Sequence, residues 1–154
     1  MSADTDIRRA TSGDVDGIIV VEHASFSTPE EIFTRQQVRA LIANPRATVL
    51  VATSGDGMIA GWAGGLIRRH RGGASGRLYA IAVHPSARGA KFGRRLLEAV
   101  LAGLHAGGAN KVYLEVRADN HAAINLYKTA GFTFRKDLPD YYGPARHGVS
   151  MIRE

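Results

Sequence analysis

Hydrophobic residues recur along the chain with two different periods, and each period predicts a different element. Five apolar residues repeat at helical spacing and mark one face of a helix: Leu96, Leu97, Val100, Leu101 and Leu104. This strongly amphipathic helix is expected to begin near Phe92 and to end at the glycine pair 107–108.

The segment 111–117 alternates instead. Val112, Leu114 and Val116 point to one side of the chain, and the residues between them, Glu115 included, point to the other. Alternation with this period predicts a strand that has one buried face.

Capping and breaking residues set the other boundaries. Thr11 with Asp14 three residues later is a capping-box pattern that opens a first helix. The pair Thr28-Pro29 opens a second helix, which ends before Asn44-Pro45. Residues 68–76 read as a basic, glycine-rich loop. The apolar run after them predicts a strand buried on both faces.

The expected strands and helices are interspersed along the chain and make one mixed α/β domain spanning residues 1–154. In chain order they are a strand at 7–9, helices from Thr11 and from Thr28 to Ala43, strands at 47–53, 58–67 and 77–83, a helix from Phe92, a strand at 111–117, a helix from Asp119 or Asn120 to Ala130, and strands at 132–136 and 148–153.

Composition narrows the chemistry. The 154 residues are 45% hydrophobic and contain no cysteine, which excludes disulfides, thiolate metal sites and cysteine nucleophiles. The six histidines are scattered, so no metal site is expected. The N-terminal residues are polar and no apolar run is long enough for a membrane span, so we expect a cytoplasmic protein without a membrane partner.

The formal charge of +6 favours an anionic partner: a nucleic acid, an acidic substrate or a phosphorylated cofactor. The run Arg68-Arg69-His70-Arg71 has no interleaved aromatic residues, so it reads as a solvated loop and no nucleic-acid partner is expected. The oligomeric state is left as monomer or homodimer.

The segment 83–94 has the properties of an anion site. It joins a buried strand to the amphipathic helix through a glycine-bearing turn, and a helix N-terminus presents free backbone N–H groups to an anion. Arg88, Lys91, Arg94 and Arg95 add positive charge. The segment is neither a Walker A loop nor a dinucleotide fingerprint. A tight turn with solvated basic residues is the alternative interpretation.

The turn Arg88-Gly89-Ala90-Lys91-Phe92-Gly93 resembles motif A of the GNAT superfamily of N-acetyltransferases, which has the form Arg/Gln-x-x-Gly-x-Gly/Ala. Lys91 stands where the motif usually has its first glycine. The backbone N–H remains there, so phosphate binding survives if the local dihedral angles accommodate a side chain. A second set of residues is similar to the bacterial ribosomal-protein alanine N-acetyltransferases: Leu114-Glu115-Val116-Arg117, Asn120, Ala123, Leu126-Tyr127, Gly131-Phe132 and Tyr141-Tyr142.

The resemblance implies a fold and a set of roles. The fold is a mixed, mostly antiparallel sheet of six to seven strands with a splayed central pair, flanked by about four helices. Glu115 matches the general base of the family, and Tyr127 matches its general acid. Acetyl-CoA is the implied co-substrate, held by Ile81, Ala82, Val83, Arg88, Gly89, Ala90, Lys91, Phe92, Gly93, Arg94 and Asn120.

Residue chemistry is compatible with these roles but leaves alternatives. Glu115 faces away from Leu114, so it serves either as a base or in an ion pair with Arg117 or a neighbouring strand. Tyr127 either protonates the leaving thiolate or packs in the core beside Ile124. Without a cysteine, direct transfer to the acceptor amine is the simplest scheme.

The acceptor is the least constrained part. Phe26, Tyr141 and Tyr142 are expected to line its groove, although the two tyrosines serve equally well as an aromatic cap on the core. A protein or peptide amine, with the N-terminal α-amine favoured, is preferred over a small-molecule amine such as a polyamine, an aminoglycoside or an amino acid. A non-catalytic acetyl-CoA-binding module is a further alternative. Because the chain is strongly basic, it would attract a basic peptide only through a local acidic patch. Five acidic residues are candidates for such a patch: Glu22, Glu30, Glu31, Asp137 and Asp140.

Overall fold

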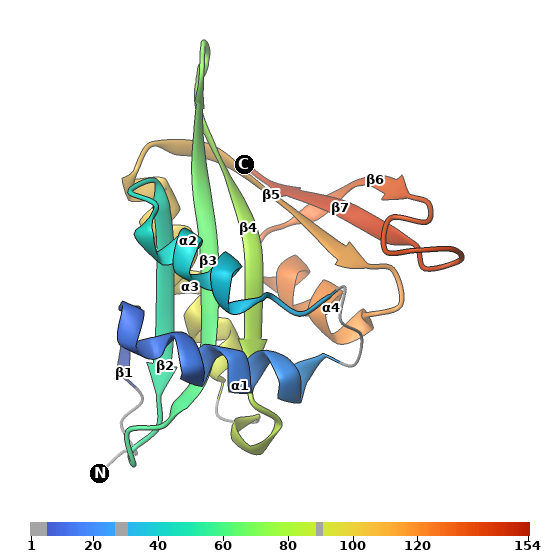
Figure 1. Cartoon of the computed structure of the whole chain (residues 1–154). Coiled ribbons are helices and arrows are strands. Elements are labelled where there is room, and N and C mark those ends of the chain that lie inside the picture. The colour runs from blue at the N-terminus through green and yellow to red at the C-terminus, as the bar shows by residue number, and fades with distance from the viewer. Residues whose placement is uncertain (1–5, 27–30, 89–90) are drawn as a thin grey trace.

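A seven-stranded sheet forms the centre of the computed structural model, which describes residues 6–26, 31–88 and 91–154 (Figure 1). Its strands lie in the order β1-β2-β3-β4-β5-β7-β6. The strands are β1 (Asp6–Arg9), β2 (Ala47–Thr53), β3 (Ile59–His70), β4 (Gly73–Val83), β5 (Ala109–Arg117), β6 (Thr133–Leu138) and β7 (Gly148–Arg153). The helices are α1 (Val15–Ser25), α2 (Arg35–Ala43), α3 (Phe92–Ala106) and α4 (His121–Thr129).

The central pair of strands, β4 and β5, separates along its length. The two strands are parallel and pair only between Ala74–Arg77 and Ala109–Tyr113. Just beyond this point β4 contains a bulge, because Gly65 pairs with Leu78 while Gly64 pairs with Ala80. A bulge bends its strand and increases the local twist. From there β4 pairs with β3 alone and β5 pairs with β7 alone, and the two strands diverge in Figure 1. The expected splayed central pair is confirmed.

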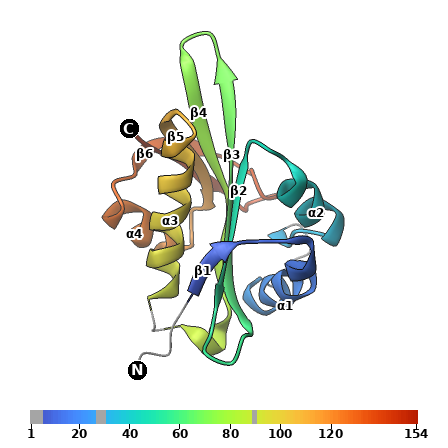
Figure 2. The same ribbon diagram turned by 90° about the vertical axis from the view of Figure 1, so that its left-hand side faces the viewer.

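Helices cover both faces of the sheet. Figure 2 shows α1 and α2 on one side and α3 and α4 on the other. The apolar stripe of α3 is buried as predicted, with Leu96, Leu97, Val100 and Leu104 fully inaccessible. Burial of each such side chain contributes roughly 1.5–3 kcal/mol. The α3 stripe belongs to one hydrophobic core. A second core lies under α1 and α2 and contains Trp62 of β3. The α/β fold expected from the sequence is therefore confirmed.

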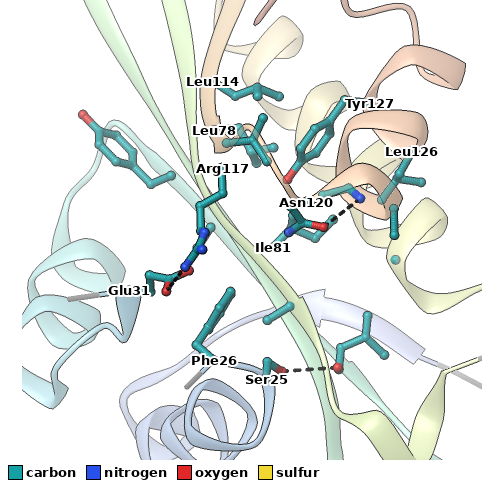
Figure 3. Close-up of a pocket in the computed structure, with 18 of the residues that line it drawn as sticks. Ser25, Phe26, Glu31, Leu78, Ile81, Leu114, Arg117, Asn120, Leu126 and Tyr127 are labelled. Atoms are coloured by element: carbon teal, nitrogen blue, oxygen red, sulfur yellow. Dashed lines mark hydrogen bonds and ion pairs between the residues drawn. The ribbon is translucent and has the colours of Figure 1, made fainter. Parts of the chain in front are cut away.

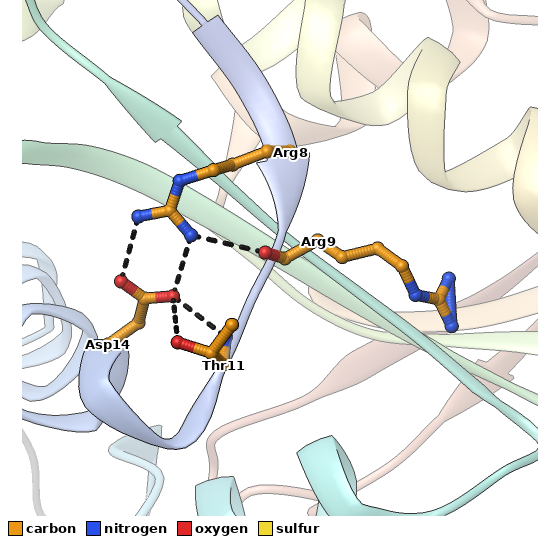
Figure 4. Close-up of polar contacts among 4 residues, drawn as sticks. All are labelled: Arg8, Arg9, Thr11 and Asp14. Atoms are coloured by element: carbon orange, nitrogen blue, oxygen red, sulfur yellow. Dashed lines mark hydrogen bonds and ion pairs between the residues drawn. The ribbon is translucent and has the colours of Figure 1, made fainter.

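The start of α1 follows the capping pattern. The backbone N–H of Thr11 donates to the Asp14 carboxylate at 2.8 Å, and a short 3₁₀ turn, Ser12–Asp14, leads into the helix. Arg8 of β1 donates two hydrogen bonds to the same carboxylate, at 2.8 and 3.0 Å (Figure 4). The hydrogen bond from Arg8 is the main reason why the pKa of Asp14 is lowered. The carboxylate therefore joins the first strand to the first helix.

The start of α2 differs from the prediction. The helix begins at Arg35, capped by Thr34, whose hydroxyl accepts from the Gln37 N–H at 3.1 Å. The predicted start at Thr28-Pro29 lies outside the described residues, and 31–34 are not α-helical. The reason is that Thr34 and Gln37 form their own capping box, which competes with the earlier signal.

The predicted basic loop at 68–76 is wrong. β3 runs to His70 and β4 begins at Gly73, so Arg71 and Gly72 alone make the turn of a long hairpin that projects from the sheet in Figure 1. Residues 68–73 are exposed, so the arm has no hydrophobic alternation by which a strand could be recognised. The prediction that 77–83 is buried on both faces is wrong too, because the run borders a cavity and Tyr79 within it is 45% exposed.

The remaining boundaries agree closely with the sequence. The bounds of β2 and β7 are as predicted, and Asn120 caps α4, its side-chain oxygen accepting from the Ala123 N–H at 3.1 Å. Gly131 after α4 has φ +97°, the left-handed conformation that glycine adopts most easily. Among the described residues, no helix has both the length and the apolar character that a membrane span requires.

Candidate functional site

A cavity of about 640 Å³ opens where β4 and β5 separate (Figure 3). Its walls come from β4, β5, the start of α3, α4, the end of α1 with the chain that follows it, and the β6–β7 loop. We call the region around Arg88, Lys91, Phe92 and Gly93 the amide end, and the region around Phe26, Glu31, Tyr141 and Tyr142 the aromatic end.

The amide end has the donor groups expected of an anion site. The first hydrogen bond of α3 runs from the Arg95 N–H to the Lys91 carbonyl, at 3.1 Å. The N–H groups of Phe92, Gly93 and Arg94 precede it, and no acceptor for them is found among the described residues. Helix N-termini leave such groups available to an anion, and the helix dipole adds positive potential. Gly89 and Ala90, two of the predicted cofactor-binding residues, lie outside the described residues.

Lys91 has a left-handed backbone conformation, which glycine adopts most easily. Its φ of 61° and ψ of 23° lie in the left-handed region, where a side chain costs about 1–2 kcal/mol. The turn therefore keeps its shape at some cost in stability. The Lys91 side chain lines the cavity together with Arg88, so the substitution adds a positive charge at the amide end.

The predicted role of the Arg94 side chain needs correction. Arg94 does not line this cavity; its guanidinium pairs with Glu98 at 2.8 Å and donates to the Thr129 hydroxyl at 2.9 Å. Glu98, one helical turn away, holds the Arg94 side chain along α3, and Thr129 holds its guanidinium against α4. Arg94 can therefore contribute its backbone N–H to the amide end, but not its charge.

The inner edge of β4 forms one long wall of the cavity. Ile81, Ala82 and Val83 all line it, as does Asn120 from the opposite side. Since β4 pairs with β3 alone in this stretch, every second backbone N–H and C=O group points toward the gap. The Val83 carbonyl accepts from the Ser25 hydroxyl at 3.3 Å. Asn120 uses its oxygen to cap α4, which leaves its amide N–H groups for the cavity.

Glu115 and Tyr127 both line the cavity. Glu115 is paired with Arg77 of β4, whose Nε lies 3.0 Å and whose Nη2 lies 2.6 Å from Oε1. Of the alternatives, the pair with a neighbouring strand therefore exists and the pair with Arg117 does not. No described residue donates to Oε2, so this oxygen keeps its capacity to accept a proton or a hydrogen bond.

Tyr127 belongs to the core and to the cavity at once. Its ring is buried and packs edge-to-face on Phe132, with the ring centroids 5.9 Å apart. Figure 3 shows its hydroxyl pointing into the cavity. Burial raises the pKa of Tyr127, so the phenol stays protonated well above neutral pH.

The aromatic end contains the three predicted acceptor-groove residues. Phe26 follows α1 and projects into the cavity in Figure 3, while Tyr141 and Tyr142 come from the β6–β7 loop, their rings 5.0 Å apart and edge-to-face. Tyr142 is half-buried, and this desolvation raises its pKa. Of the proposed acidic patch, Glu22 and Glu31 line the cavity, Asp137 and Asp140 do not, and Glu30 lies outside the described residues.

The sequence suggested Glu22 only as a member of an acidic patch, and its structural role was missed. Its carboxylate accepts from the Trp62 indole N–H at 2.9 Å and from the Phe33 N–H at 2.8 Å, and burial raises its pKa. It therefore fixes the chain after α1 to the sheet. The available signal was its position on the apolar face of α1, four residues after Ile18.

Arg77 and Tyr79 were also missed. Both line the cavity, and the Arg77 guanidinium lies 5.5 Å from the centre of the Tyr79 ring. Among the described residues, no cluster of three or more histidine, aspartate or glutamate side chains is arranged to hold a metal ion.

Comparison with known proteins gives consistent matches over nearly the whole chain. The sequence pattern of the "Acetyltransferase (GNAT) family" matches residues 18–132. A mycothiol acetyltransferase of Arthrobacter sp. (strain FB24) is 34% identical over 142 residues, covering 88% of this chain and 44% of the relative. A putative [ribosomal protein bS18]-alanine N-acetyltransferase of Bacillus subtilis (strain 168) is 30% identical over 137 residues, covering 88% of this chain and 85% of the relative.

The fold is shared with solved structures as well. The NatC complex bound to Gag peptide and CoA contains a chain that superposes with a TM-score of 0.86 at 19% identity, covering 97% of this chain and 98% of that one. The chain spans less than half the length of the mycothiol acetyltransferase that it matches. From its fold, its cavity and the family pattern, the chain belongs to the acetyltransferase (GNAT) family.

Proposed function

We propose that the chain transfers an acetyl group from acetyl-CoA directly to a primary amine. The observation that carries the proposal is the joining of two features in one cavity. At one end α3 begins with backbone N–H groups that have no acceptor among the described residues, and beyond them a carboxylate, Glu115, and a buried tyrosine, Tyr127, both line the cavity. The first feature suits a diphosphate, and the second suits proton transfer.

The residues present fit acetyl-CoA. The N–H groups of Phe92, Gly93 and Arg94 hold the diphosphate, with Arg88 and Lys91 adding charge. The open edge of β4 from Ile81 to Val83 offers backbone partners to the amide groups of the pantetheine arm. Acetyl-CoA supplies the acetyl group as a thioester, which an amine attacks only after losing a proton.

Glu115 takes the proton of the acceptor amine. Its Oε1 is held by Arg77, so Oε2 is the atom that accepts the proton, either from the amine itself or through an intervening water. Arg77 is a positioning residue in this scheme because it fixes the carboxylate without touching the amine.

Tyr127 supplies the proton that the departing thiolate of CoA needs. Its buried phenol remains protonated at physiological pH because its pKa is raised. In the complete reaction a C–N bond forms and the C–S bond breaks. Glu115 takes the amine proton and releases it to solvent, the thiolate takes the proton of Tyr127 and becomes the free thiol, and Tyr127 regains a proton from solvent.

An α-amine is the acceptor group we favour. Its pKa is about 8, whereas that of a lysine amine is about 10.4, so a far larger fraction of α-amine is unprotonated at neutral pH. A protein or peptide N-terminus is the carrier predicted from sequence, supported by the likeness to a ribosomal-protein alanine N-acetyltransferase.

A small compact amine is the other candidate carrier. The likeness to mycothiol acetyltransferases supports it, and the ion pairs described below favour it over a long polypeptide. Polyamines and aminoglycosides are the least favoured members of this class. The three carboxylates that line the cavity each have a donor: Glu22 bonds Trp62, Glu31 bonds Arg117 and Glu115 bonds Arg77. A polycation gains little from carboxylates already satisfied in this way.

A thiol-release screen tests the proposal. Acetyl-CoA is incubated with peptide N-termini, lysine peptides, amino acid amides, polyamines and aminoglycosides, and free CoA thiol is measured. We expect release with α-amines and little with the polycations. Tight acetyl-CoA binding in a calorimeter without thiol release from any amine would instead identify a non-catalytic binding module. The cytoplasmic location stays a prediction.

A further inference from the structure

We infer that Glu31, Arg117 and Arg146 select the acceptor by length: they admit a compact α-amine and exclude a polypeptide that continues past its first residues. The inference rests on the proposed function and names the substrate class of the same site. It follows from ion pairs that join three segments far apart in the sequence at the aromatic end.

The ion pairs link three segments at the aromatic end; Glu31 and Arg117 line the cavity, and Arg146 reinforces the pair from outside its lining. Glu31 lies in the chain between α1 and α2, Arg117 ends β5, and Arg146 lies in the β6–β7 loop. Nη1 of Arg117 lies 3.0 Å from Oε2 of Glu31, and Nη2 of Arg146 lies 3.7 Å from the same oxygen. Figure 3 shows the Arg117 side chain pointing toward Glu31, with a dashed line for the ion pair.

These ion pairs of Glu31 with Arg117 and Arg146, which we call the bridge, are sheltered from solvent and held by further contacts. The Glu31 side chain is 13% exposed and that of Arg117 is 26% exposed. Arg117 is also fixed by two bonds to Asp119, at 3.0 and 2.8 Å. Bonds to Asp119 and then Glu31 raise the pKa of Arg117, so its charge is permanent. A partly buried pair of this kind resists salt better than an exposed one.

The bridge joins the two walls that a long acceptor would have to pass between. Phe26 and Phe33 border the same opening from the α1 side, and Tyr141 and Tyr142 border it from the β6–β7 loop. Glu115 and Arg117 lie two residues apart on the same face of β5, which separates them by roughly 7 Å. A polypeptide advances about 3.3–3.6 Å per residue, so an acceptor whose α-amine lies at Glu115 and whose chain follows β5 reaches the bridge with its second or third residue. The cavity of about 640 Å³ must also admit the acetyl-bearing arm of CoA, which leaves room for a compact acceptor.

The experiment compares acceptors that differ in length alone. The probes are amino acid amides and unstructured glycine-serine peptides headed by the same residue, and kcat/KM is measured by thiol release. We expect the wild-type chain to favour the amide by about tenfold or more. We expect Glu31→Gln to reduce this ratio by about fivefold, the scale of one ion pair.

Two further variants provide a second test of the bridge and a matched control. Arg146→Gln weakens the bridge from the other loop, so it should lower the same ratio even if Glu31→Gln does not fold. Asp16→Asn is the matched control, because it removes an ion pair with Arg35 at the solvent side of α1 and α2, outside the cavity. The control should leave the ratio unchanged.

The outcomes separate the two proposals. Equal use of the amide and the long peptide by the wild-type chain, or a ratio that neither bridge variant moves, overturns the length selection while the acetyltransferase proposal stands. Absence of thiol release with every amine overturns the proposed function, and this inference with it.

Discussion

At the amide end of the cavity the groups that face the ligand are backbone N–H groups on one continuous segment, whereas at the aromatic end they are charged and aromatic side chains from three distant segments. The first arrangement depends on a turn and a helix start, which a local sequence can encode. The second depends on how the elements pack. The difference teaches that the proposed co-substrate site can be predicted from a local sequence, whereas the proposed acceptor site depends on the tertiary structure.

Substitution of Glu115 is expected to have the largest effect, because it should remove catalysis while leaving the amide end intact. We expect Glu115→Gln to lower kcat by about 10³-fold, within the usual range of general-base catalysis. Acetyl-CoA affinity should stay near the wild-type value, because that depends on the amide end. The loss should shrink as pH rises toward the pKa of the amine, since the free base then forms without help. Steady-state kinetics across pH, with the Kd of acetyl-CoA, measures both; a loss that is equal at every pH would contradict the role.

Tyr127→Phe comes next, with an expected fall in kcat of about 10²-fold and little change in the Kd of acetyl-CoA. The phenol ring stays in the core beside Phe132, so the variant should fold normally. Because burial raises the pKa of Tyr127, the wild-type rate should not decline from loss of this proton below pH 10. Unchanged turnover in the variant would remove Tyr127 from the chemistry.

The smallest of the three effects separates conformation from charge at the amide end. Lys91→Gly should stabilise the fold by about 1 kcal/mol, because glycine adopts the left-handed conformation without strain. Lys91→Ala should keep the strain and gain no such stability. Both variants lose the positive charge, so both should bind acetyl-CoA somewhat more weakly. Urea unfolding and calorimetry give the two quantities, and equal stability of the two variants would refute the strain at Lys91.

The sequence predicted the parts of the fold that have a clear period or a local capping signal. The stripe of α3, the alternation of β5 and the Asn120 cap were all found in this way. The hairpin arm at 68–73 was missed because both of its faces meet solvent. The first turn of α2 was misplaced because two capping signals compete within a few residues.

The candidate site also has parts with a local sequence signal and parts without one. The turn around Lys91 could be predicted, including the demand for a glycine-like conformation. The partner of Glu115 could not, since Arg77 is nearly forty positions away and its approach depends on the register of β4 and β5. The bridge could not be predicted either, because Glu31, Arg117 and Arg146 are even further apart in the sequence and meet only in the folded chain.

The central claim is that free backbone N–H groups at the start of α3 bind the diphosphate of acetyl-CoA, and Gly93 offers the most direct test. A Cβ at this position meets nothing closer than 3.7 Å, so Gly93→Ala has room, and proline is tolerated in a first helical turn. Gly93→Pro removes one N–H, whereas Gly93→Ala keeps it. The account predicts that calorimetry gives an acetyl-CoA Kd about tenfold weaker for Gly93→Pro and nearly unchanged for Gly93→Ala. Equal affinity of the two folded variants would contradict it.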